Sequence, residues 1–304
     1  MKLIQKGNKG YKQLNKTRTP RPLGSTLRGG NFIMIDTHSH IDGPEFSDDL
    51  SETIQRAKEA GVKCIFIPGI CLKDTPRIFE ICEQHEGYLY PMIGLHPENI
   101  MDEDFHHVLD EMEKMLHEKL NDDTCTVKPI AVGEVGIDLY WDATYKAEQI
   151  EAFERQISWA EKYDLPLMIH TRNAHKELME IMEKHRGSNL KGVFHCFSGT
   201  EEEAKELLSF PGFMLGIGGV CTFKKSTLPE VLKNCVPLNR IVLETDSPYL
   251  APVPMRGKRN ESAFLTYTAD KLSHIYNVEK SVFMQQTEEN VVKVFSKCSF
   301  FKKK

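Results

Sequence analysis

The chain has 304 residues, of which 40% are hydrophobic and 27% charged, so it can bury a sizeable core as one large or two medium-sized domains. It has no apolar run near the roughly 18 residues of a membrane-spanning helix, which argues against an integral membrane protein. Its eight cysteines include no CxxC pair, so we interpret them as reduced thiols of a cytoplasmic protein and not as a disulfide or zinc framework.

The net charge of −5 is unevenly distributed along the chain. Residues 1–33 carry eight Lys or Arg and no acidic residue, which leaves 31 basic against 44 acidic residues in the remainder. Because this leader also lacks hydrophobic periodicity and an apolar signal-peptide core, we predict that 1–33 is a disordered basic segment. An organellar transit peptide and a nucleic-acid-binding arm are the alternatives. We place the folded domain at 34–298 and a basic tail at 299–304.

From Met34 onward, short apolar runs alternate with longer amphipathic segments, as in repeated βα units. We predict strands at 33–37, 62–67, 89–94, 129–133, 166–170, 192–195, 213–217 and 240–244. We predict helices at 47–60, 73–85, 103–119, 144–163, 173–186, 200–208 and 227–234, and a closing helical region at 262–296. This alternation predicts the α/β class and a single-domain (β/α)8 TIM-like barrel. A doubly wound sheet is the alternative, but the glycine cluster LGIGGV at 215–220 follows a late strand and lacks the GxGxxG spacing.

Histidines and carboxylates follow the predicted strands, at the end of the barrel where active sites of this fold lie. The stretch THSH places His38 and His40 after the first strand, on the same side of the chain because residues i and i+2 of an extended segment point the same way. The later strands end at, or are followed by, His96, Glu134, His170, His195 and Asp246. We therefore expect these side chains to meet at one rim.

The chemistry of this set indicates a metal centre. Four imidazoles (His38, His40, His170, His195) and two carboxylates (Glu134, Asp246) suit divalent ions such as magnesium, manganese or zinc. Six ligands are too many for one tetrahedral site and suit two ions that share a bridging carboxylate. Some barrel hydrolases use a carbamylated lysine as the bridge after the fourth strand, but Lys128 precedes that strand here, so Glu134 is the available bridge.

Taken in order, the stretches IDTHSHID, GLHPE, GEVGID, IHTRNAH, FHCFSG and ETDSPYLAPVPMRGKRNES resemble the motifs of the TatD-type metal-dependent deoxyribonucleases of the amidohydrolase superfamily. The resemblance covers the chain from about Met34 to Phe295. It implies a TIM-like barrel with a dinuclear site that hydrolyses phosphodiester bonds of DNA, commonly as a 3′–5′ exonuclease.

The resemblance also implies an assignment of the ligands. His38 and His40 would bind one ion with Asp246 nearby, His170 and His195 would bind the second, and Glu134 would bridge the two. Asp246 would in addition accept a proton from the attacking water, so Asp246 and Glu134 are the candidate catalytic residues. An aminoacyl-tRNA deacylase or a small-molecule amidohydrolase could use the same site, and a metal-holding binding protein is the non-enzymatic alternative.

Further residues of the expected rim could contact the substrate. We predict phosphate contacts for His96, Arg172 and Arg256, the last within a basic patch that includes GKR at 257–259. The expected partner is DNA or another nucleic acid, with no membrane and no obligate protein partner.

Three other rim residues have competing structural interpretations. Tyr140 and Trp141 could stack on a nucleobase, although packing against the neighbouring helix explains them at least as well. Asn173 is better explained as a helix N-cap.

Overall fold

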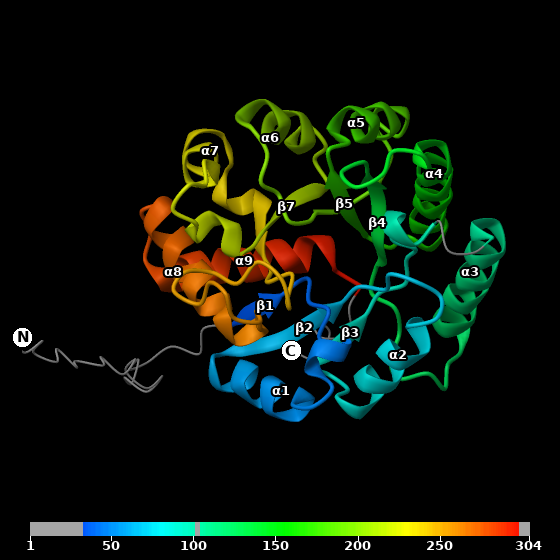
Figure 1. Ribbon diagram of the computed structural model, residues 1–304, viewed down its shortest axis with the longest axis horizontal. Coiled ribbons are helices and arrows are strands. Elements are labelled where there is room, and N and C mark those ends of the chain that lie inside the picture. The colour runs from blue at the N-terminus through cyan, green and yellow to red at the C-terminus, as the bar shows by residue number, and fades with distance from the viewer. Residues whose placement is uncertain (1–32, 101–103, 298–304) are drawn as a thin grey trace, which may run out of the picture. The chain divides into compact units, whose positions relative to one another are not determined.

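The computed structural model describes residues 33–100 and 104–297, in which eight parallel strands alternate with helices (Figure 1). The strands are β1 (Met34–Asp36), β2 (Val62–Ile67), β3 (Leu89–Pro91), β4 (Val132–Asp138), β5 (Leu167–Arg172), β6 (Gly192–Phe194), β7 (Phe213–Ile217) and β8 (Ile241–Leu243). The α-helices are α1 (Leu50–Glu59), α2 (Thr75–Gln84), α3 (Phe105–Asn121), α4 (Lys146–Tyr163), α5 (His175–Lys184), α6 (Glu201–Leu208), α7 (Leu228–Cys235), α8 (Leu265–Ile275) and α9 (Lys280–Val294).

The strands pair in chain order, β1 to β3 in one parallel sheet and β4 to β8 in a second. Isolated parallel bridges join the two sheets at both seams, Ile93 with Val132 at one and Ser39 with Ser247 at the other. At the second seam the Thr37 amide also donates to the Leu243 carbonyl at 3.0 Å. The chain therefore has the predicted (β/α)8 TIM-like fold, with helices around the strands (Figure 1).

Two apolar layers stabilise this arrangement. A large cluster lies between the strands and the amphipathic helices, for which α1 is an example because it buries Thr53, Ile54 and Ala57 on one face. A second cluster joins residues of the strands other than β4, and Ile130 and Ala131 just before β4, with Val291, Val294 and Phe295 at the end of α9. The ring centroids of Phe295 and Phe66 are 4.8 Å apart, so the end of α9 packs directly on this inner layer.

Several predicted boundaries differ from the structure. The fourth strand covers 132–138 instead of 129–133, so Glu134 lies inside β4 and not after it. Asn173 does not cap α5, because the helix begins at His175 after Ala174, and Asn173 has a left-handed backbone with φ of 55°. The closing region is interrupted between α8 and α9, where Asn277 has φ of 50°. Apart from Ile33, the predicted leader lies outside the described residues, as does the tail.

Within the described part of the chain, no helix is both long enough and apolar enough to cross a bilayer.

Candidate metal centre

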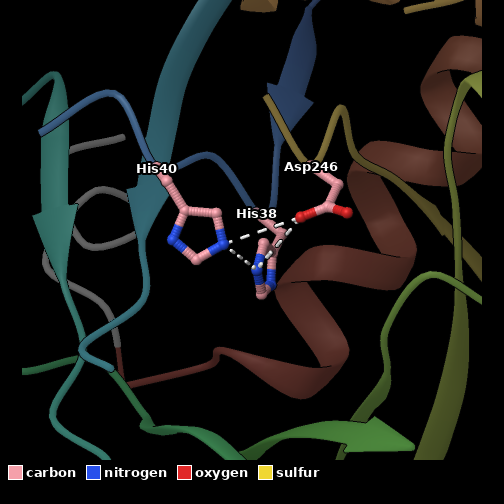
Figure 2. Close-up of side chains that lie close together, drawn as sticks. All are labelled: His38, His40 and Asp246. Carbon is pink, nitrogen blue, oxygen red and sulfur yellow. Dashed lines mark hydrogen bonds and ion pairs between the residues drawn. The ribbon is translucent and has the colours of Figure 1, made fainter. Parts of the chain in front are cut away.

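The first group of candidate ligands comes from the segments that follow β1 and β8. His38 and His40 turn to the same side, as their spacing predicts, and their Nε2 atoms are 3.2 Å apart. Asp246 Oδ1 lies 3.8 Å from His38 Nε2 and 3.6 Å from His40 Nε2 (Figure 2). The Asp246 amide donates to the His38 carbonyl, so a backbone hydrogen bond fixes the two segments against each other.

Glu134 reaches the same space from a β-bulge in β4. The register of β4 against β5 shifts between Gly133 and Val135, which leaves Glu134 out of the regular pairing. Bulges beside active sites commonly redirect a side chain in this way. A Cβ atom at Gly133 would lie 2.4 Å from the Met168 Cβ, so a larger residue would not fit beside the bulge. The Gly133–Glu134 peptide bond is cis.

The two carboxylate oxygens of Glu134 face different sets of imidazoles. Oε2 lies 3.1 Å from His38 Nε2 and 3.5 Å from His40 Nε2. Oε1 lies 2.9 Å from His170 Nδ1 and 2.8 Å from His195 Nε2. Glu134 therefore stands between two pairs of nitrogen donors, one pair on each oxygen.

The second set includes a further histidine. His170 Nδ1 and His195 Nε2 are 3.2 Å apart, and the His96 Nε2 lies 3.4 Å from Glu134 Oε1. The rings of His96 and His170 meet edge to face, with centroids 4.5 Å apart. The structure thus brings His96, which the sequence suggested as a phosphate contact, into the range of a candidate ligand.

A carboxylate outside the predicted set of site residues orients His170. Asp138, the last residue of β4, has its Oδ2 2.7 Å from His170 Nε2. This contact orients the ring and favours a proton on Nε2, so Nδ1, on the side of Glu134, is the nitrogen that a metal ion could bind. Its position at a strand end within GEVGID is the signal that could have identified Asp138.

Glu244 has a similar position beside His195 and is likewise not among the residues predicted from the sequence. Its Oε1 lies 3.7 Å from His195 Nδ1, which is too long for a hydrogen bond, and accepts one from the Cys196 amide. Glu244 and Asp246 repeat the i, i+2 spacing of His38 and His40, and that repetition could have drawn attention to it.

The buried charges of the site support one another. Burial by itself raises the pKa of Glu134, but the imidazoles of His195 and His38 outweigh it and hold that pKa well below its usual value. Burial lowers the pKa of His195, but the charge of Glu134 outweighs it and raises the pKa well above its usual value. The carboxylate is therefore ionised, and protons and metal ions compete for the imidazole nitrogens.

This donor set fits divalent metal ions. Among the residues that the structure describes, three groups of side chains converge closely enough to hold an ion: His38 with His40 and Asp246, His38 with Glu134 and His195, and His96 with Glu134 and His170. The ring nitrogens of His38 and His40 that face each other are 3.2 Å apart, as are those of His170 and His195, so a bound cation would stabilise each pair. The combination of imidazole and carboxylate suits magnesium, manganese or zinc.

The remaining predicted contacts have different surroundings. Arg172 donates from Nε to Asp138 Oδ2 at 2.7 Å and pairs with Glu98, so two carboxylates already compensate its charge. Arg256 lies over the ring of Phe223 at 4.0 Å, and its contacts in the described chain include no candidate ligand.

Part of the predicted basic patch is paired internally. Arg259 Nη1 lies 2.8 Å from Asp49 Oδ1, and its Nη2 donates to Asp49 Oδ2 at 2.8 Å. Its guanidinium therefore stabilises the contact with the start of α1 instead of offering a free charge.

Comparison with known proteins agrees with the motifs. A family model described as "TatD related DNase" matches residues 35–296. The chain is 32% identical over 263 residues to an "Uncharacterized metal-dependent hydrolase YabD" of Bacillus subtilis, which covers 86% of this chain and 99% of the relative. It is 28% identical to the "3'-5' ssDNA/RNA exonuclease TatD" of Yersinia pseudotuberculosis, over 86% of this chain and 99% of the relative.

Solved structures show the same fold. The TatD homologue YJJV of Escherichia coli superposes with a TM-score of 0.79 at 29% identity, covering 86% of this chain and 98% of that chain. A TatD-family hydrolase of Entamoeba histolytica gives a TM-score of 0.75 at 23% identity, covering 86% of this chain and 97% of the other. The chain therefore belongs to the TatD related DNase family of metal-dependent hydrolases.

Proposed function

We propose that this protein is a phosphodiesterase that hydrolyses DNA from its 3′ end and uses two divalent ions. The observation that carries the proposal is the placement of Glu134, whose oxygens face two separate imidazole pairs. A carboxylate in that position could bridge two ions. His38, His40 and Asp246 would hold one ion, and His170 and His195 would hold the other. Two such ions, when bound, lower the pKa of water and stabilise charge on the phosphate oxygens.

The chain's own residues divide the remaining tasks. Asp246 stands beside the first imidazole pair with its carboxylate ionised, so it can accept the proton of the attacking water. Asp138 keeps His170 in one tautomer and one orientation. Glu134, 2% exposed, stays ionised at the centre and is shielded from bulk water.

The choice of substrate rests on the relatives. The Yersinia relative is named a 3′–5′ ssDNA/RNA exonuclease, and the family is described as TatD related DNases. We extend that substrate to this chain and propose that it acts in the cytoplasm, with its cysteines reduced.

The test is a panel of end-labelled single-stranded DNA, duplex DNA, RNA and aminoacyl-tRNA, each incubated with magnesium, manganese or EDTA. We expect shortening of DNA from the 3′ end with metal and none with EDTA. A preference for the aminoacyl ester, or no cleavage of any phosphodiester with either metal, would contradict the proposal. Glu134→Gln serves as the inactive control, because it keeps the shape and removes the charge.

A further inference from the structure

Exposed aromatic rings gather around the metal centre. Among the described residues, three aromatic side chains are strongly exposed: Tyr140 at 52%, Trp141 at 74% and Tyr249 at 57%. Tyr249 belongs to the turn that follows Asp246, and its ring centroid lies 6.3 Å from that of His40. An indole left in water forgoes much of the stabilisation that its burial would give, so its exposure beside a site calls for a ligand.

A short chain of contacts connects Trp141 to the ligands. The Arg172 guanidinium carbon lies 5.7 Å from the Trp141 ring centroid and 4.8 Å from that of Tyr140. Arg172 also donates to Asp138, which contacts His170. Two side chains therefore separate Trp141 from a candidate metal ligand.

The same contacts leave the indole free to take a partner. Tyr140 and Trp141 meet edge to face, with centroids 4.6 Å apart and planes at 83°. Arg172 supports both rings, while Asp138 and Glu98 neutralise its charge. Trp141 is thus held by Tyr140 and Arg172 but remains 74% exposed, whereas Trp159 in α4 is 1% exposed.

We propose that Trp141, supported by Tyr140 and Arg172, forms a subsite that stacks on an unpaired nucleobase next to the phosphate bound at the metal centre. This inference rests on the proposed function, because it takes the phosphate position from it. An unpaired base offers a flat π-face, whereas bases inside a duplex are already stacked on one another, so the subsite favours single-stranded substrates.

The binding test uses the fluorescence of the full-length protein. The chain has two tryptophans, of which Trp141 is exposed and Trp159 buried. We expect phosphorothioate octathymidylate, which resists hydrolysis, to quench the emission of Trp141 in magnesium. A phosphorothioate oligomer of tetrahydrofuran residues, with the same backbone and no bases, should not quench it. Trp141→Phe should abolish the response while leaving the emission of Trp159.

The kinetic test combines a change in the enzyme with one in the substrate. Stacking on one base corresponds to roughly 5- to 150-fold in binding. We therefore expect Trp141→Ala to lower kcat/KM on single-stranded DNA by about that factor, and to change it by less than about twofold on a strand whose 3′-terminal residues lack bases. Trp141→Phe should recover part of the loss. Val282→Ala, an exposed apolar residue on α9, is the matched control and should match wild type on both strands.

The outcomes separate this inference from the proposed function. Equal effects of Trp141→Ala on strands with and without bases, or equal quenching by both oligomers, would overturn the subsite even if the wild-type protein cleaves DNA. Base-dependent quenching by a protein that cleaves no phosphodiester would support the subsite and reject the proposed function.

Discussion

Single residues at the centre act through charges that their neighbours hold in place. Asp246 illustrates this. Burial by itself raises the Asp246 pKa, but the contact with His40 and the charges of His195 and His38 lower that pKa by more. The net pKa lies below the usual value, so the carboxylate is ionised near neutral pH. Its position beside two imidazoles and its charge suit it both to bind a metal and to accept a proton.

Asp246→Asn separates that chemistry from folding. The amide keeps the shape but loses the charge and the basicity. We expect DNA hydrolysis to fall at least about a hundredfold, since general base assistance alone contributes about 10²–10⁴ in rate. The melting temperature should stay close to that of wild type. Near-normal hydrolysis at saturating metal would place the proton acceptor elsewhere.

Asp138→Ala tests whether His170 needs its partner. Without the Asp138 contact, the imidazole can rotate and change tautomer, so we expect manganese affinity to fall about 10- to 100-fold in calorimetric titration. Asp138→Asn retains an acceptor and should recover part of the loss. Asp142→Ala, on the exposed loop that follows, is the control. Unchanged affinity in Asp138→Ala would show that packing alone orients His170.

At the scale of elements, β4 determines the geometry of the site. It carries Glu134 on its bulge and Asp138 at its end, and it pairs with β5, which carries His170. The sequence predicts the candidate ligands, because residues near the carboxyl ends of parallel strands converge at one end of a barrel. It does not predict the bulge, since that depends on the fit between Gly133 and Met168 of the neighbouring strand. The predicted fourth strand, 129–133, therefore lies too early in the chain and leaves Glu134 after it.

Gly136→Ala tests the close approach of β4 to β5. Gly136 has φ of 144°, and a Cβ atom there would lie 1.9 Å from the His170 carbonyl oxygen. We expect a loss of about 2–4 kcal/mol in the free energy of unfolding, measured by urea denaturation, and weaker metal binding because His170 moves.

Gly87→Ala is the control for Gly136, because Gly87 also has a positive φ of 80° but open space around its Cβ position. Its cost should be limited to backbone strain, about 1 kcal/mol. If both substitutions cost the same, the predicted collision with β5 would be wrong.

The start of α1 provides a pH-dependent test. Asp49 accepts hydrogen bonds from Arg259 and Arg56, and that of Arg259 is the main cause that holds the Asp49 pKa well below its usual range. A lowered pKa stabilises the fold above the unfolded value of about 3.9, and this contribution is lost as pH falls toward the folded pKa. We expect Asp49→Asn to cost up to about 1 kcal/mol at pH 7, since the pair is partly exposed.

Urea denaturation of wild type and Asp49→Asn between pH 7 and pH 3 measures this contribution. The difference in unfolding free energy should be constant above about pH 5 and shrink below about pH 4. A difference that persists undiminished at pH 3 would mean that the charge of Asp49 is not its cause.

At the scale of the whole molecule, the fold follows from the alternation of buried strands and amphipathic helices, which is why it was predictable. The six candidate ligands were predictable as a group because each is a metal-binding residue type at, or just after, the end of a predicted strand. Asp138 and Glu244 were not selected, because their roles depend on contacts between neighbouring strands. The roles of Tyr140 and Trp141 could not be decided from the sequence, because the exposure of Trp141 depends on how its loop folds.

Anomalous diffraction from crystals soaked in manganese tests the central claim most directly. We predict two peaks per chain, about 3.5–4 Å apart, on either side of the Glu134 carboxylate. One should lie beside Oε2 with His38 and His40, and the other beside Oε1 with His170 and His195. A single peak at saturating manganese, or two peaks of which only one contacts Glu134, would contradict the account.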